Sequence, residues 1–242
     1  MIPLAGLPEL EEGDDLGRLL ADACVRAGGL EPGDVVVVAQ KAVSKVEGRI
    51  VDLTQVEPSQ RAVERAGEDG DPQQVEVILR ESAEVVRSRP PLVISRTRHG
   101  FVCASAGVDA SNAKGPGTVI LLPLDPDASA AALRERLEQL TAIAPGVIVS
   151  DSFGRAWRQG TTDVALGVAG LAALRDLRGS HDAGGYELRS TMIAVADEIA
   201  GAAELVMGKS TGVPAVIVRG VDAAGDGNAR DLVMPPERDL FP

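Results

Sequence analysis

The longest unbroken apolar pattern in the first part of the chain is Val35–Ala39, which directly follows a Pro-Gly-Asp turn at residues 32–34. Consecutive β-branched residues without polar alternation predict a strand that is buried on both faces of a sheet. Residues 1–8 are typical of a short strand and a turn. Shorter apolar runs bounded by turn residues predict further strands at Leu92–Ser95, Phe101–Ala104, Val119–Leu122, Val147–Ser150 and Ala215–Arg219.

One helix has a clear start signal after the polar stretch at residues 52–71. Asp71 can cap the helix and Pro72 suits its first position, because the proline nitrogen needs no hydrogen-bond partner there. The predicted apolar face of this helix consists of Val75, Ile78, Leu79, Val85 and Val86.

Helical spacing predicts three more helices, around Leu16–Ala27, Ser129–Leu140 and Thr191–Met207. The glycine-rich stretch from Gly154 to Gly185 predicts no definite element. Strands and helices are interleaved without a strict βαβ rhythm, which favours an α+β fold with mixed sheets. We expect residues 1–242 to form a single unit, in which the sequence fixes no boundary between lobes.

Composition and charge narrow the classes of protein. Apolar residues make up 45% of the chain but aromatic residues only 2%, so the core must be aliphatic. The net charge of -12 excludes a broad nucleic-acid footprint, which needs a surplus of Lys and Arg. Two isolated cysteines, no signal-peptide pattern and no membrane-spanning apolar run predict a cytoplasmic protein without membrane contact.

Two carboxylates stand directly after predicted strands, with small and polar neighbours. Asp109 lies in Ala-Gly-Val-Asp-Ala-Ser-Asn at residues 106–112, and Asp151 in Val-Ser-Asp-Ser-Phe-Gly-Arg at residues 149–155. Mg²⁺ and Mn²⁺ prefer oxygen ligands, so both residues suit a metal site if their strands are neighbours, and Ser152 could add a hydroxyl. Aspartates are also common in strand-end turns, and spacing alone favours that interpretation.

Cationic residues cluster in two places. Lys41 and Lys45 follow the buried strand, where they could meet a phosphate or could form a solvated strand exit. Arg155 and Arg158 flank the sole Trp in a glycine-rich segment, which suits an anionic ligand, although a Trp more often belongs to a core. Gly208-Lys209-Ser210 is not a Walker loop, because it follows a predicted helix and precedes a strand.

Taken together, six ordered segments resemble the coenzyme F420 γ-glutamyl ligases. The resemblance extends over nearly the whole chain and favours the metal-site interpretation of the two aspartates. The matching segments are Gly6–Leu10, Gln40–Gly48, Val77–Ser82, Gly107–Asn112, Asp151–Arg158 and Ala196–Ala200.

This resemblance implies a ligase that uses GTP and Mg²⁺ or Mn²⁺ to join L-glutamate to the coenzyme F420 precursor, with two metal ions and room for a monovalent K⁺. The carboxylate of the precursor would be phosphorylated and then attacked by the amine of glutamate, and later rounds would extend a γ-linked tail. An intertwined, two-lobed homodimer is also implied. The implied metal ligands are Asp109 and Asp151 for the first ion and Ser152 for the second, and the implied GTP contacts are Leu7, Pro8, Glu9, Leu10, Gln40, Lys45, Asn112, Met207, Gly208, Lys209, Ser210, Thr211, Gly212, Val213 and Pro214.

Two positions depart from the pattern of the family. Gln40 stands where some members have a serine or threonine, and Lys209 stands where some have a metal-binding glutamine. An ammonium group cannot ligate a cation, so the second metal would be held differently here or replaced by the lysine charge. Arg155 and Arg158 are candidates for the substrate side of the site. Two other functions stay open, namely another metal-dependent nucleotide-using transferase and a non-catalytic anion-binding module.

Overall fold

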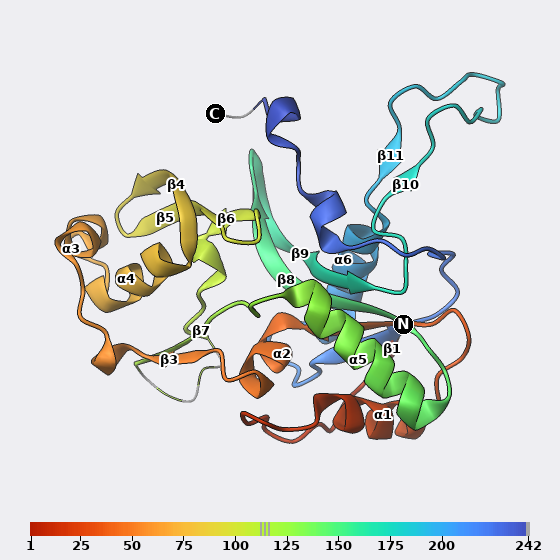
Figure 1. Cartoon of the computed structure of the whole chain (residues 1–242), viewed down its shortest axis with the longest axis horizontal. Coiled ribbons are helices and arrows are strands. Elements are labelled where there is room, and N and C mark those ends of the chain that lie inside the picture. The colour runs from red at the N-terminus through yellow and green to blue at the C-terminus, as the bar shows by residue number, and fades with distance from the viewer. Residues whose placement is uncertain (112, 114, 116, 241–242) are drawn as a thin grey trace.

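The main sheet forms the centre of the molecule. The structure is a computed structural model that describes residues 1–111, 113, 115 and 117–240. Its main sheet has the strand order β1 (Ile2–Pro3), β12 (Ala215–Val218), β2 (Val35–Ala39), β8 (Gly146–Arg155) and β9 (Arg158–Ala169). Strands β2 and β8 are parallel, and the other neighbouring pairs are antiparallel. The antiparallel pair β8 and β9 is labelled in Figure 1.

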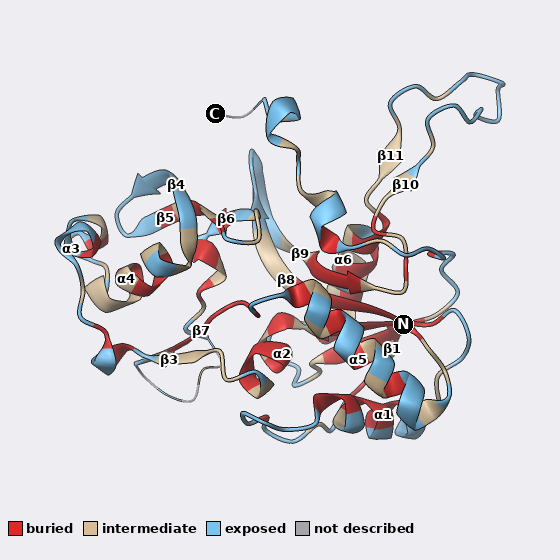
Figure 2. Ribbon diagram, in the orientation of Figure 1, coloured by how far each residue is buried: buried red, intermediate tan, exposed pale blue. Residues whose placement is uncertain are grey.

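Both faces of β2 are covered, as the valine run predicted. Val36 and Val38 pack into a cluster with α1 (Leu16–Arg26), α2 (Gln40–Val46) and α5 (Pro126–Thr141). Val35 and Val37 belong to the opposite cluster, which α6 (Val195–Met207) covers. Because full burial of a valine side chain stabilises a fold by about 1.5–3 kcal/mol, this strand contributes strongly to the packing of both layers. Figure 2 shows that the buried residues gather in the central strands and on the helix faces that cover them.

The capped helix is confirmed at its start but ends earlier than predicted. Asp71 accepts hydrogen bonds from the amides of Gln73 and Gln74, and α4 covers Pro72–Glu81. The placement of Val85 and Val86 on its apolar face is wrong, because both lie in strand β4 (Ser82–Arg89). The hydroxyl of Ser82 donates to the carbonyl of Ile78, and the backbone from Ser82 onward pairs with β5 (Leu92–Thr97).

The predicted strands at residues 92–95 and 101–104 lie with β4 in a smaller sheet that is set apart from the main one. Its order is β4, β5 and β6 (Val102–Ala104), and nearby β3 (Ile50–Asp52) pairs with β7 (Thr118–Ile120). The polar stretch at residues 52–71 holds a short 3-10 helix, Leu53–Gln55, and α3 (Gln60–Ala66). Residues of α4, β5 and β7 form an apolar cluster of their own beside the main sheet, and α3 packs with α4 in a second, smaller cluster (Figure 1).

The glycine-rich stretch that predicted no element contains the edge strand of the main sheet and an exposed arm. Strand β9 returns along β8 as a long hairpin, and β10 (Arg175–Asp176) pairs with β11 (Met192–Ile193) at the base of the arm (Figure 1). The remaining elements are the 3-10 helices Ser105–Gly107, Ala229–Leu232 and Pro236–Arg238. The α+β prediction is confirmed. Among the described residues, no helix combines the length and apolar character that crossing a bilayer requires.

Candidate functional site

The parallel pairing of β2 and β8 brings the two predicted chemical segments to the same edge of the sheet. Ala39 lies opposite Ser150, so α2 begins beside the point where β8 continues into Asp151 and Ser152. Crevices at the carboxyl ends of such strands are common ligand sites. A cavity of about 580 Å³ lies here, and its walls include Leu7–Leu10, Ala39–Ala42, Lys45, Ala113, Ser150–Ser152, Asp163, Glu204 and all of Met207–Pro214 except Thr211.

Strand alternation separates the polar groups of β8 onto the two faces of the sheet. Val149 packs with the α1, α2 and α5 cluster, whereas Ile148 packs with the α6 cluster. Since successive side chains in a strand point to opposite faces, Asp151 belongs to the α2 side, and Ser150 and Ser152 belong to the α6 side. The cavity at the sheet edge is lined by groups from both sides.

On the α2 side, Asp109 is held by a cation. A backbone bridge to Ile120 fixes its position, and its carboxylate lies 2.7 Å from the ammonium of Lys41, which lines the cavity. The same ammonium donates to the hydroxyl of Ser111 at 2.5 Å, and the Ser111 amide donates to Asp109. Burial would raise the pKa of Asp109, but the hydrogen bonds from Lys41 and Ser111 outweigh it and lower the pKa.

Asp151 is poised differently from Asp109. Burial raises its pKa to about 7, and the negative charges of Asp163 and Asp109 act in the same direction. The backbone amide of Ser152 and the charge of Lys41 oppose that rise. A neighbouring cation would favour the ionised form of such a carboxyl, which is the form that a metal ligand must have.

On the α6 side, the two serines of β8 share one carboxylate. Asp163, on β9, accepts a hydrogen bond from Ser150 at 2.8 Å and one from Ser152 at 2.5 Å. Asp163 and Ser150 were not among the residues indicated by the sequence pattern. The signal that could have found them is the pair of serines on either side of Asp151, directly after the apolar start of β8, but the partner of that pair depends on the register of the hairpin.

Several of the predicted nucleotide contacts interact with one another or with other protein groups in this structure. Lys45 lines the cavity, and its ammonium lies 2.5 Å from the carboxylate of Glu9, which is largely exposed. Gln40 is buried, and its amide nitrogen donates to the hydroxyl of Ser44 and to the carbonyl of Leu121. Gln40 therefore also joins the start of α2 to the chain that leaves β7.

The predicted nucleotide loop at residues 207–214 follows the end of α6. Its backbone turns at Gly208, the hydroxyl of Thr211 donates to the carbonyl of Met207, and Thr211 is not among the residues that line the cavity. Lys209 and Ser210 line the cavity. Asn112, another predicted contact, lies outside the residues that the structure describes.

The structure does not bring Arg155 and Arg158 into this cavity. They lie opposite each other at the tip of the β8–β9 hairpin, on either side of Trp157, whose surface is 82% exposed. The tip is four residues beyond Asp151, which at roughly 3.3 Å per residue is about 13 Å along the strand. Their assignment to the substrate stays a prediction.

The protein oxygens in this site fit a divalent ion only if water or a bound substrate supplies the remaining ligands of the ion. Among the described residues, no three His, Cys, Asp or Glu side chains gather closely enough to form a metal site. Mg²⁺ usually needs only one or two carboxylates, because water and substrate phosphates supply the other oxygens. Asp109 and Asp151 are such a pair on the α2 side, and the hydroxyl of Ser152 offers one more oxygen on the α6 side, so the residues fit metal ions that arrive with a nucleotide.

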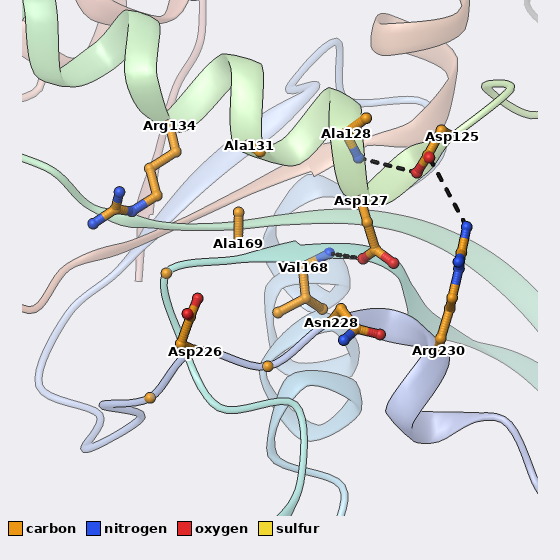
Figure 3. Close-up of a pocket in the computed structure, with 13 residues that line it drawn as sticks. Asp125, Asp127, Ala128, Ala131, Arg134, Val168, Ala169, Asp226, Asn228 and Arg230 are labelled. Carbon is orange, nitrogen blue, oxygen red and sulfur yellow. Dashed lines mark hydrogen bonds and ion pairs between the residues drawn. The ribbon is translucent and has the colours of Figure 1, made fainter.

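A larger hollow, of about 800 Å³, lies between α5, β9 and the segment 225–230 (Figure 3). It contains none of the predicted site residues. Asp127 accepts hydrogen bonds there from the amides of Val168 and Ala229, and Asp125 approaches Arg230 at 3.9 Å. These contacts join the edge strand β9 and the C-terminal segment to α5, which is a structural role for Asp125 and Asp127.

Comparison with known proteins decides among the functions that the sequence left open. The model of the family described as F420-0:Gamma-glutamyl ligase matches residues 6–220. The chain belongs to the F420-0:gamma-glutamyl ligase family. The matched range contains all the positions to which the resemblance assigned a metal or a GTP contact, and those roles stay predictions.

Relatives of full length support the same assignment. The coenzyme F420:L-glutamate ligase of Methanopyrus kandleri is 46% identical over 242 residues, which cover 96% of this chain and 93% of the relative. The ligase of the same name from Methanothermobacter thermautotrophicus is 44% identical, and the match covers 100% of this chain and 98% of the relative. The ligase of the same name from Archaeoglobus fulgidus is 43% identical, and the match covers 100% of this chain and 95% of the relative. The prediction of an amide-forming ligase is confirmed.

Proposed function

We propose that this chain joins L-glutamate to the F420 precursor F420-0 at the expense of GTP, with Mg²⁺ or Mn²⁺ held at the sheet edge. One observation carries the proposal. A single cavity gathers the loop Leu7–Leu10, Lys45, Asp151, Ser152 and the loop after α6, although these lie far apart in the sequence. Asp109 joins this set through its ion pair with Lys41.

The proposed reaction has two steps. A terminal carboxylate oxygen of the precursor attacks the γ-phosphorus of GTP, and GDP leaves with the electrons of the broken bond. The amine of glutamate then attacks the carbonyl carbon of the acyl phosphate, loses a proton and expels phosphate as the amide forms. Repetition with the new terminal carboxylate would give γ-linked additions.

The side chains of the cavity mainly have to balance charge, because every substrate is anionic and the chain itself carries -12. Phosphoryl transfer depends chiefly on positioning and charge stabilisation, so no protein nucleophile is required. Lys41 and Lys45 offer ammonium groups on one wall. A divalent ion bound by Asp109 and Asp151 would neutralise phosphate charge. A second ion would take the hydroxyl oxygen of Ser152, or the charge of Lys209 would replace part of the charge of that ion.

Product analysis tests this function directly. Purified protein is incubated with F420-0, glutamate, GTP and Mn²⁺, and mass spectrometry then follows the deazaflavin. We expect mass increments of glutamate and release of GDP only when both acceptor and amine are present. GDP release without glutamate addition would favour another nucleotide-using transferase. Ligand-induced stabilisation without turnover would favour a binding module.

The proposed assembly is a homodimer, as implied by the family resemblance. Sedimentation equilibrium of the purified chain tests it, with a dimer mass as the expected result.

Lys45→Ala should weaken GTP binding by about 10- to 100-fold, because a charge-assisted phosphate contact contributes about 1.5–3 kcal/mol. Isothermal titration with a non-hydrolysable GTP analogue measures the change. Arg18→Ala is the matched control, since it also removes one positive charge but from an exposed pair with Asp22 on α1. Wild-type affinity in the Lys45 variant would make this lysine only a partner of Glu9.

Arg158→Lys should raise the Michaelis constant for the precursor or for glutamate by about tenfold, because lysine keeps the charge but loses the two-pronged contact with a carboxylate or phosphodiester. GTP affinity should stay unchanged. Arg189→Lys, on the exposed arm between β10 and β11, is the control. A lower melting temperature with unchanged substrate constants would instead give Arg158 a role in bracing the hairpin tip.

A further inference from the structure

Asp163 is a buried carboxylate that no role in the proposed reaction explains. The residue is 5% exposed, and it lies on β9 directly opposite Ser152 in the hairpin register. One carboxylate oxygen accepts from the Ser152 hydroxyl at 2.5 Å and the other from the Ser150 hydroxyl at 2.8 Å. All three residues line the cavity at the end of β8.

These two contacts determine what the serines can offer to a ligand. An ionised carboxylate only accepts hydrogen bonds, and a serine hydroxyl has a single proton to donate. Both hydroxyl protons are therefore directed at Asp163. The Ser152 oxygen is left with lone pairs for the cavity, which attract a cation but repel an anionic phosphate oxygen.

We propose that Asp163 is a positioning residue that directs the Ser152 hydroxyl proton away from the cavity, so that the Ser152 oxygen receives a divalent cation rather than a phosphate. This inference rests on the proposed function, because it states that Ser152, one residue of the proposed metal site, offers the cavity a lone pair rather than a hydroxyl proton. It also places Asp163 where supporting carboxylates act in metal sites, behind the ligand that they orient.

A purely structural role for Asp163 explains less of what is seen. Backbone pairing already holds Ser152 against Asp163 and Ser150 against Ala165, so the hairpin does not need the side-chain bridge for its register. Neighbouring residues on this face, Ile148 and Ala165, are apolar and pack against α6. Burying a carboxylate costs free energy unless its hydrogen bonds offset the loss of water. If position 163 served packing alone, an apolar residue there would stabilise the fold more.

The test measures Mn²⁺ binding rather than turnover. Titration of Mn²⁺, followed by electron paramagnetic resonance in the presence of a non-hydrolysable GTP analogue, gives the affinity of each variant. Asp163→Asn should weaken Mn²⁺ binding by about 10- to 100-fold, because the amide accepts with one atom only and frees one hydroxyl to rotate. Asp163→Thr, which suits a strand but carries no charge, should show the same loss.

Asp127→Asn is the matched control. Asp127 is also a carboxylate that accepts two hydrogen bonds beside β9, but it lies in the other hollow and not in the site cavity (Figure 3). We expect this variant to melt at a lower temperature and to bind Mn²⁺ like the wild type.

A double-mutant cycle separates positioning from general damage. In a Ser152→Ala background, Asp163→Asn should cause little further loss of Mn²⁺ affinity, because the hydroxyl through which Asp163 acts is already gone. Wild-type affinity in Asp163→Asn, or an equal loss in both backgrounds, would overturn the positioning role while leaving the proposed function intact. A wild-type protein that binds no Mn²⁺ with the GTP analogue would overturn both.

Discussion

Asp109→Asn and Asp151→Asn should each lower kcat/KM by on the order of 100-fold or more at low Mn²⁺, while both variants still fold. Each change removes one anionic oxygen ligand at nearly constant volume, and a catalytic metal contributes several kcal/mol of charge stabilisation. Steady-state GDP release over a range of Mn²⁺ concentrations measures the effect, and high Mn²⁺ should restore part of the activity.

The two variants differ in what else they disturb. Asp109→Asn also leaves the Lys41 ammonium without its carboxylate partner at 2.7 Å, so it should additionally lower the melting temperature. Asp151→Asn removes a carboxyl whose pKa burial has raised to about 7, so its loss should cost less stability. Asp52→Asn, an exposed aspartate bound to Thr54 outside the site, is the control. Wild-type turnover by both site variants at low Mn²⁺ would contradict the assignment of Asp109 and Asp151 as metal ligands.

Local sequence signals predicted the central strand and one helix start correctly. Four consecutive valines allow only a strand buried on both faces, and the Asp71-Pro72 pair satisfies the first amides of α4. The end of α4 could not be predicted in the same way. Val85 and Val86 continue an apolar pattern, but pairing with β5, a tertiary contact, decides that they form a strand.

The same distinction applies to the candidate site. Asp109 and Asp151 stand next to strand signals and could be proposed from the sequence, and the family resemblance then identified them. Asp163 could not, because its contact with Ser152 depends on the register of β8 and β9. A register shift occurs between the pairs Val149–Gly167 and Ser150–Ala165, and no sequence pattern predicts such a shift. The position of Arg155 and Arg158 at the hairpin tip depends on the same register.

A second large effect is expected far from the site, at the end of the central sheet. Asp34, directly before β2, is 1% exposed, and the guanidinium of Arg219, just after β12, donates two hydrogen bonds of 2.8 Å to it. Arg219 also reaches the carboxylate of Glu31 and the carbonyl of Gly29. Removing one partner of a buried pair leaves the other charge unpaired, which commonly costs 3–5 kcal/mol.

Arg219→Met should therefore lower the free energy of unfolding by about 3 kcal/mol at pH 7, at the low end because the Arg219 side chain is 32% exposed. That corresponds to a fall in melting temperature of roughly 10 °C for a chain of this size. Urea unfolding measures the free energy. Arg18→Met, in an exposed pair, should change it by less than about 1 kcal/mol.

The pH dependence of the free energy of unfolding tests whether the unpaired charge of Asp34 destabilises the Arg219→Met variant. In the wild type, burial would raise the pKa of Asp34, but hydrogen bonds from Arg219 and the Glu31 amide outweigh it and lower the pKa. A lowered pKa stabilises the fold above the unfolded value of about 3.9, and this contribution is lost as the pH falls through the folded pKa. Without Arg219, burial dominates and the pKa of Asp34 should rise, so the variant should lose stability as the pH increases above about 3.9. The difference between variant and wild type should therefore shrink from pH 7 to pH 4. A difference that stays constant over this range would mean that lost packing of the Arg219 side chain, rather than the unpaired charge of Asp34, destabilises the variant.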